Sequence, residues 1–150
     1  MMLLRRDRAM TAVAVMLDVA FHAGRSGTVS AADIAERAGM ARRGIEPLLQ
    51  TLSRSGLLES VRGPRGGYRL GYPRRDITIA DIITRVLEDD APAEETPKGP
   101  LFVEVIEPFW SELDTELRAR LAKLTLDELM RRAEAAGLAR PLAEPISFSI

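Results

Sequence analysis

The sequence predicts a mainly α-helical fold with one small β-hairpin and a long helix near the C-terminus. Apolar residues recur every three or four positions along most of the chain, which is typical of helices that bury one face. At residues 57–71 this pattern gives way to two short apolar runs flanking the turn VRGPRGG, which indicates a hairpin. A final apolar stripe at residues 101–124 is longer than so small a body can cover, and it indicates dimerisation.

Composition limits the kinds of protein that this chain can be. Its 150 residues suffice for one domain with its own core. The chain has no cysteine and a single histidine, His22, which excludes disulfides and thiolate ligands and argues against any metal site. No apolar run reaches the roughly 18 residues of a membrane span, so we expect a cytoplasmic protein without a membrane partner. No catalytic set is recognisable, and we predict no enzyme activity.

The two halves of the chain carry opposite charge. Residues 1–75 hold 13 arginines against 6 acidic residues, a net charge of +7. Residues 76–150 hold 8 basic and 16 acidic residues, a net charge of −8. This asymmetry indicates that the first half contacts a polyanion, although a basic surface for a protein partner would explain it equally well.

Two helices are expected before residue 40. The first spans Arg8 to Ala23, with an apolar stripe formed by Met10, Val13, Leu17, Ala20 and Phe21. Ser30 and Asp33 resemble a capping box that begins a short second helix. Gly39 is expected to end that helix.

A third helix carries the apolar stripe Ile45, Leu48, Leu49 and Leu52. Proline costs about 3 kcal/mol deep inside a helix but little in its first turn. Pro47 therefore predicts regular helix mainly after Glu46, with an irregular start at Ala41 to Ile45. Gly56 closes this helix, and the strands LLESVR and GYRLG follow it.

Three more helices are expected, at residues 77–88, 101–124 and 125–136. Capping pairs mark two of their starts, Thr78 with Asp81 and Thr125 with Glu128. The order of three helices and then a hairpin is that of a winged helix-turn-helix. We therefore divide the chain into a winged helix-turn-helix domain at 1–88, an acidic proline-rich linker at 89–100, dimerisation helices at 101–136 and a tail without assigned structure at 137–150.

The turn between the strands concentrates glycine and arginine. Gly63 and its neighbouring glycines let the backbone turn tightly and approach a phosphate chain, while Arg62 and Arg65 direct charge at a groove. A solvated hairpin whose arginines only aid solubility is the plain alternative. A nucleotide-binding loop is disfavoured because a strand, and not a helix, follows the glycines.

Several stretches resemble the Rrf2 family of bacterial transcription regulators, of the IscR, NsrR and CymR type. They are MLDVAFHAG, ADIAERAGM, IEPLLQTLSRSGLLESVRGPRGGYRL, ITIADII and FWSELDTELRARLAKLTLDEL. The resemblance runs from about residue 3 to residue 129. It implies a dimeric winged-helix protein that binds palindromic operators.

The resemblance also implies roles for single residues. Arg62 would enter a minor groove, and Glu46 would accept a hydrogen bond from a cytosine amino group. Ala41 and Arg43 fall where relatives can have small hydroxyl residues. Arg42 or Arg43 would therefore either donate to guanine or hold phosphate.

The largest departure from the family concerns its [2Fe-2S] cluster. Relatives that bind one place three cysteines in the loop before the long helix, where this chain has EDDAPAEETPKGP. Glu107 stands where some relatives have a ligating histidine. We expect no cluster and no other cofactor, and the effector is left unknown.

The sequence thus predicts a homodimeric regulator of transcription, more often a repressor than an activator, that binds double-stranded DNA. The predicted DNA contacts are Ala41, Arg42, Arg43, Glu46, Arg62, Gly63, Arg65, Arg5, Arg6 and Arg8, with Arg25 as a further phosphate contact. The predicted dimer contacts are Val105, Phe109, Trp110, Leu113, Leu117 and Leu121. The rival hypothesis is a winged-helix module that docks proteins without reading DNA. A third hypothesis adds a small-molecule pocket between the winged domain and the long helix.

Overall fold

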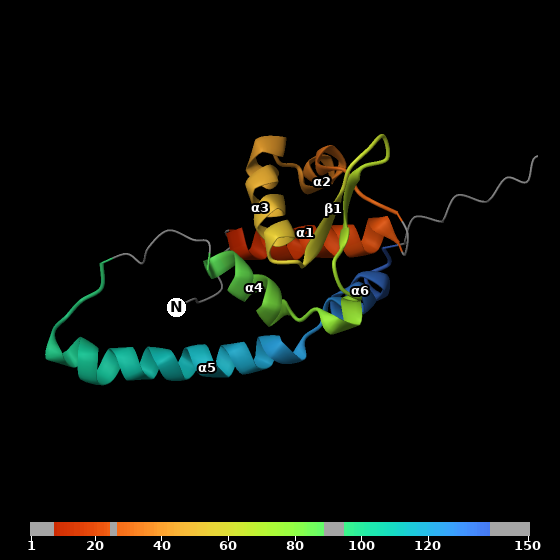
Figure 1. Cartoon of the computed structure of the whole chain (residues 1–150). Helices are drawn as coiled ribbons and strands as arrows, with labels where there is room; N and C mark the ends of the chain where they lie inside the picture. The colour runs from red at the N-terminus through yellow and green to blue at the C-terminus, as the bar shows by residue number, and fades with distance from the viewer. Residues whose placement is uncertain (1–7, 25–26, 89–94, 139–150) are drawn as a thin grey trace, which may run out of the picture.

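The computed structural model describes residues 8–24, 27–88 and 95–138 (Figure 1). Within these residues the elements follow the predicted order, with three helices before a two-stranded antiparallel hairpin. They are α1 (Arg8–Ala23), α2 (Ala31–Ala38), α3 (Arg42–Arg54), β1 (Leu58–Val61), β2 (Gly67–Leu70), the 3₁₀ turn η1 (Arg74–Asp76), α4 (Ile79–Glu88), the π-helical turn η2 (Phe102–Ile106), α5 (Glu107–Lys123) and α6 (Leu126–Ala135). The mainly helical winged helix-turn-helix fold is confirmed.

Helix α1 runs through the middle of the molecule, with α2, α3 and the hairpin on one side and α4, α5 and α6 on the other (Figure 1). Its buried residues include Ala12, Met16 and Val19. The apolar stripe predicted for this helix was right in part. Ala20 is buried, and Val13, Leu17 and Phe21 pack against the core, but Met10 is 56% exposed. Helix α1 is apolar around most of its circumference, so residue spacing alone does not identify the face that its small alanines bring against the core.

The predicted helix caps are present. The Ser30 hydroxyl accepts a hydrogen bond from the Asp33 N–H at 3.1 Å, and Gly39 ends α2 with φ +65°. Thr78 and Asp81 cap each other reciprocally, at 3.0 and 3.1 Å. These signals were readable because each involves residues three positions apart.

The irregular start predicted for α3 was wrong, since the helix is regular from Arg42 onward with Pro47 inside it. Pro47 lacks the N–H that would bond the Arg43 carbonyl, a defect of about 3 kcal/mol. Ile45 and Leu49 are fully buried on the same helix, and burying such a side chain contributes about 1.5–3 kcal/mol. Packing of the apolar face therefore outweighs the proline.

The end of α5 and α6 share one core with the helices that precede them. Leu121, Leu126 and Met130 are buried in the same cluster as the apolar residues of α1 and α4. Backbone hydrogen bonds from Ile79 N to Leu124 O and from Leu126 N to Ile77 O, both 2.9 Å long, join the two segments. None of the described helices is long and apolar enough to cross a membrane.

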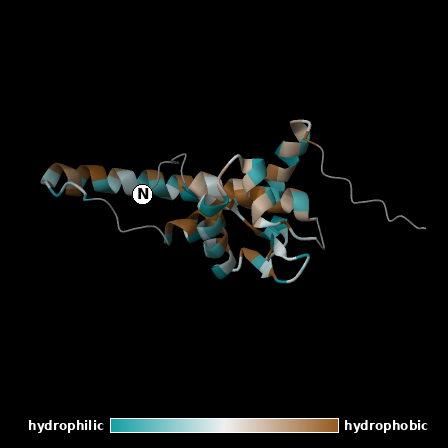
Figure 2. Cartoon of the chain, turned by 90° about the horizontal axis from the view of Figure 1, so that it is seen from above, coloured by the Kyte–Doolittle hydropathy of each residue, from teal (hydrophilic) through white to brown (hydrophobic). Residues whose placement is uncertain are grey.

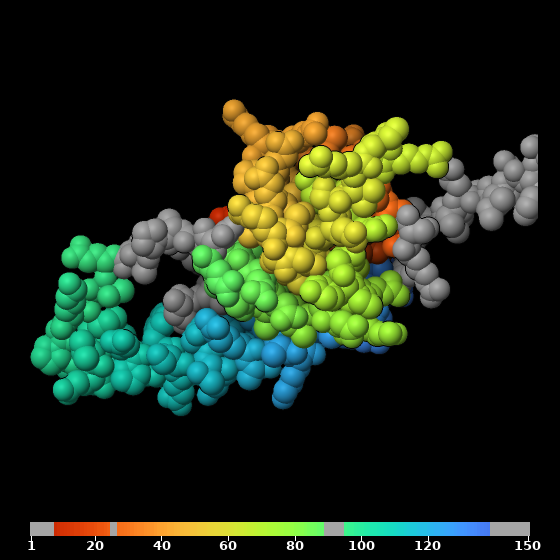
Figure 3. Space-filling model, viewed as in Figure 1, coloured from red at the N-terminus to blue at the C-terminus, as the bar shows by residue number. Residues whose placement is uncertain are grey.

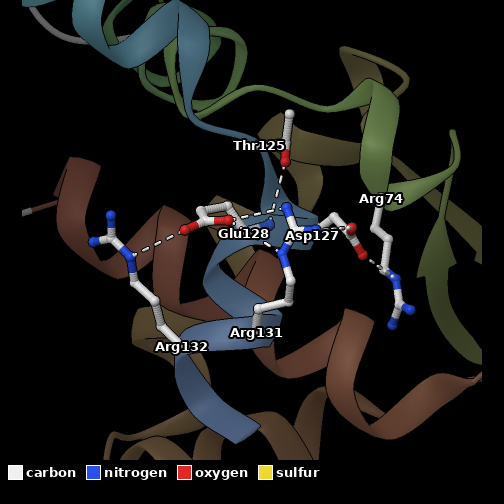
Figure 4. Close-up of polar contacts among 6 residues, drawn as sticks. All are labelled: Arg74, Thr125, Asp127, Glu128, Arg131 and Arg132. Carbon is white, nitrogen blue, oxygen red and sulfur yellow. Dashed lines mark hydrogen bonds and ion pairs between the residues drawn. The ribbon is translucent and has the colours of Figure 1, made fainter. Parts of the chain in front are cut away.

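Polar contacts hold α6 in place (Figure 4). The Thr125 hydroxyl accepts from the Glu128 N–H at 3.2 Å, as the sequence predicted. Arg74 of η1 pairs with Asp127, with Nε and Oδ1 2.8 Å apart. The turn after the hairpin is thereby fixed to the first turn of α6.

The N-terminal end of α5 extends away from the body of the protein (Figures 1 and 2). The predicted long helix is present, but it begins with the π-helical turn η2. Hydrophobic residues colour much of this free end in Figure 2, and the exposed ones are Leu101, Val103, Val105, Ile106, Phe109 and Trp110.

Candidate nucleic-acid interface

A polar recess of about 450 Å³ lies between α3 and the hairpin. These two elements occupy the end of the molecule opposite α5 (Figure 3). The recess is lined by Ser30, Ala31, Arg42, Glu46, Gln50, Ser60, Val61, Gly66, Gly67 and Tyr68. It brings two of the predicted DNA contacts, Arg42 and Glu46, to one surface with the base of the β1–β2 hairpin, which is the wing of this fold.

Arg42 and Glu46 form an exposed ion pair on α3, with Nε and Oε1 2.8 Å apart. They are four residues apart and therefore lie on the same face of the helix. An exposed pair of this kind contributes little to stability, typically 0–1 kcal/mol. Breaking this ion pair therefore costs little free energy, and each side chain is able to bind another partner instead.

The other predicted positions on α3 lie outside the recess. Ala41 is the N-cap residue, and its side chain makes no capping hydrogen bond. Arg43 is exposed but does not line the recess, because each residue of an α-helix is turned by about 100° from the previous one. Sequence reasoning missed Gln50, although its spacing of four residues from Glu46 places it on the same face.

The wing turn is built as its glycines predicted. Gly63 has φ +114°, and the Gly66 N–H donates to the Gly63 carbonyl at 2.8 Å. A Cβ at Gly66 would lie 2.5 Å from the Val61 carbonyl oxygen, so the turn has no room for a side chain there. Arg62 and Arg65 are both exposed on this turn.

Main-chain hydrogen bonds fix the wing to the segment before α2. Val29 and Tyr68 exchange two backbone hydrogen bonds, of 2.8 and 2.9 Å. The Thr28 hydroxyl donates to the Arg65 carbonyl at 2.7 Å. Gly67 is needed at this contact, because a Cβ would lie 2.5 Å from the Val29 carbonyl oxygen. The hairpin is thus held in a defined position relative to the helix-turn-helix.

Some arginines of the basic half are engaged with carboxylates. Arg69 on β2 donates to Glu59 on β1 through two hydrogen bonds of 3.0 Å, which lower the pKa of Glu59 and raise that of Arg69. Arg37 donates to Asp18, and this hydrogen bond raises the pKa of Arg37. These arginines are therefore less available to an external anion than those of the wing turn.

Of the four arginines predicted to contact phosphates from outside α3 and the wing, the structure describes only Arg8. Arg8 Nη2 donates to the Thr51 hydroxyl of α3 at 3.1 Å, so its guanidinium lies against the helix that lines the recess. Arg5, Arg6 and Arg25 were predicted to contact phosphates, and they lie outside the described residues.

The predicted dimer contacts are in three environments. Val105, Phe109 and Trp110 are 55%, 50% and 37% exposed on the free part of α5. Leu113 is partly exposed. Leu117 packs against the chain's own core, and Leu121 is 7% exposed within it. The six residues therefore do not form one solvent-facing surface.

A sequence model of the Rrf2 family, described as "Iron-dependent Transcriptional regulator", matches residues 6–132. The chain belongs to the Rrf2 family. It is 39% identical over 123 residues to the HTH-type transcriptional regulator IscR of Photobacterium profundum, a match that covers 80% of this chain and 71% of the relative. As a member of a regulator family, the protein is a DNA-binding transcription regulator and not an enzyme.

Solved structures of Rrf2 relatives have the same fold. IscR of T. potens superposes with a TM-score of 0.73 at 31% identity, over 93% of this chain and 94% of that one. CymR, the global cysteine regulator of B. subtilis, superposes with a TM-score of 0.69 at 26% identity, over 87% and 98% of the two chains.

The residues of this Rrf2 member do not fit an iron-sulfur cluster. Such clusters are held by cysteine thiolates, with histidine replacing some of them in a few types. The chain contains no cysteine. The described residues contain no group of three His, Asp or Glu side chains placed to hold a metal ion. His22 and Glu107 lie on separate helices, and residues 89–94 of the acidic segment lie outside the described part of the chain.

Proposed function

We propose that this Rrf2 regulator is a homodimer that reads a palindromic operator and acts as a repressor. Each copy places α3 in a major groove and its wing in the neighbouring minor groove. The observation that carries the proposal is the shared recess, where the Arg42 and Glu46 face of α3 opens toward the hairpin. A winged helix-turn-helix must hold these two elements together to contact adjacent grooves.

Each proposed DNA contact has a defined chemistry. Glu46 accepts from a cytosine amino group once DNA displaces Arg42, which then donates to a guanine or a phosphate. Arg62, next to Gly63 in the wing turn, enters the minor groove, and Arg65 contacts the edge of that groove. The phosphate contacts are Arg5, Arg6, Arg8 and Arg43. Ala41, the N-cap residue of α3, contacts DNA where this helix begins.

A second copy covers the apolar end of α5. Val105, Phe109 and Trp110 are the exposed apolar residues that such an interface would bury, and aromatic residues of this kind commonly dominate interface energies. A two-fold dimer repeats the recess at one helical turn of DNA, roughly 34–36 Å away. The operator is therefore expected to be palindromic.

Selection of bound sites from random genomic duplexes tests the proposal. The wild type should enrich one palindromic sequence, Glu46→Ala should relax a single base position in each half-site, and Arg62→Ala should weaken binding. Glu116→Ala and Arg75→Ala change the same residue types at exposed positions outside the recess. These two controls should enrich the wild-type sequence.

Failure of the selection would favour the rival function. If no sequence is enriched, and excess random DNA abolishes all binding by the wild type, the protein does not read DNA sequence. The basic half would then serve a protein partner.

A further inference from the structure

An apolar groove of about 600 Å³ lies on the face formed by α1, α2 and the end of α6. Its lining includes Met10, Leu17 and Phe21 from α1 and Met40 from the turn before α3. Met10 and Met40 are 56% and 42% exposed. Binding sites in proteins are commonly concave and lined mostly by apolar side chains.

The end of α6 places the last described residue, Leu138, at this groove. Gly137 adopts φ +86°, the Gly137 N–H donates to the Glu134 carbonyl at 3.0 Å, and the Leu138 N–H donates to the Ala133 carbonyl at 3.1 Å. These two hydrogen bonds define a Schellman motif, in which the chain reverses direction and the residue after glycine contacts the last helical turn. Ala133 and Leu138 both line the groove.

The next residues of the chain have the composition to occupy it. Residues 139–150 read ARPLAEPISFSI, which lie outside the described part of the chain. Two prolines disfavour a helix in this segment. Ile146, Phe148 and Ile150 alternate with serines, so an extended segment would present all three on one face.

The dimensions of the segment and the groove agree. From Ile146 to Ile150 an extended chain spans roughly 13 Å. The groove follows α1 from Met10 to Phe21, about 16 Å along the helix. The seven residues 139–145 can reach roughly 23 Å, which is enough to place the apolar end anywhere along this face.

We propose that residues 139–150 dock in the groove of their own chain, with Ile146, Phe148 and Ile150 against α1. The docked tail covers Met10, Met40 and Leu138 from solvent. It also restrains the turn between α2 and α3, because Met40 belongs to that turn. This inference is independent of whether the protein reads DNA.

Engineered cysteines test the proposal, because the sequence contains no cysteine that would compete with them. Met40→Cys combined with Phe148→Cys should form an intramolecular disulfide under mild oxidation at least 10-fold faster than Glu36→Cys combined with Phe148→Cys. Glu36 is exposed on α2 and does not line the groove, so docking in the groove should not favour a cross-link to it. Rates are followed by non-reducing electrophoresis.

A tail variant separates docking from simple tethering. Ile146→Ser with Ile150→Ser leaves the described body unchanged and should slow the Met40 cross-link to the rate of the Glu36 control. Equal rates for the Met40 and Glu36 pairs, or a Met40 rate unchanged by the serines, would overturn the proposal. A disulfide that joins two chains would also overturn it, by showing that the groove receives the tail of a second copy.

Discussion

The winged body and the free part of α5 have the same helical spacing of apolar residues but opposite environments. In the body, Ile45, Leu49 and Leu52 of α3 are fully buried. On α5, Val105 and Phe109 are about half exposed, and burial begins only toward Leu121. An apolar stripe therefore predicts that a helix face will be covered, but not whether the same chain or another covers it.

Leu121→Ala should cause the largest loss of folding stability among these variants. Leu121 is buried in the core, and truncating such a residue costs about 2–5 kcal/mol of unfolding free energy. Urea unfolding measures this loss, and Glu116→Ala, an exposed change on the same helix, should leave stability within about 0.5 kcal/mol. An undiminished stability together with weaker dimerisation would assign Leu121 to the interface and break the comparison.

Phe109→Glu should affect the free part of α5 in the opposite way. A charge within a dimer interface should weaken self-association by 2 kcal/mol or more, roughly 30-fold. Unfolding of the monomer should change far less than for Leu121→Ala, because Phe109 is 50% exposed. Sedimentation velocity over a dilution series measures the association. The account fails here if Phe109→Glu dimerises as tightly as the wild type and as the matched surface variant Glu112→Gln.

Gly67→Ala sharpens the comparison within the body, where the wing is held by close backbone contact. The added Cβ would lie 2.5 Å from the Val29 carbonyl oxygen, and overpacking of this kind costs about 1–3 kcal/mol. Hydrogen exchange should show faster exchange at the Val29 and Tyr68 amides. Gly99→Ala has open space around its Cβ and should change neither amide.

Glu59→Gln should have the smallest effect. The pKa of Glu59 is lowered by its hydrogen bonds from Arg69, so its contribution is present above the usual carboxyl pKa and is lost as the pH falls through the lowered value. Wild type should melt slightly above Glu59→Gln at neutral pH, and the difference should vanish in acid. A difference that persists in acid would show that the ion pair is not its cause.

Local signals were predictable from the sequence, and contacts between distant segments were not. The caps at Ser30 and Thr78 and the turn at Gly63 each depend on residues within three or four positions. The regular start of α3 was missed because burial of Ile45 and Leu49 offsets Pro47, which only the packed structure reveals.

The candidate site was predictable to a similar degree. Glu46, Arg42 and the wing turn were identified from residue type and family resemblance. The contact between Val29 and Tyr68 joins residues 39 positions apart, and no local sequence pattern predicts it. The exposure of Val105 and the burial of Leu121 on one helix likewise depend on where the body of the protein ends.

The stoichiometry on DNA tests the central claim most directly. Sedimentation of the wild type with a duplex that carries the selected palindrome should give a complex that contains two chains of 16.5 kDa. A duplex with only one half-site should bind far more weakly. One chain per duplex, with equal affinity for the half-site and the full palindrome, would contradict the account of a dimer that reads DNA through two copies of α3.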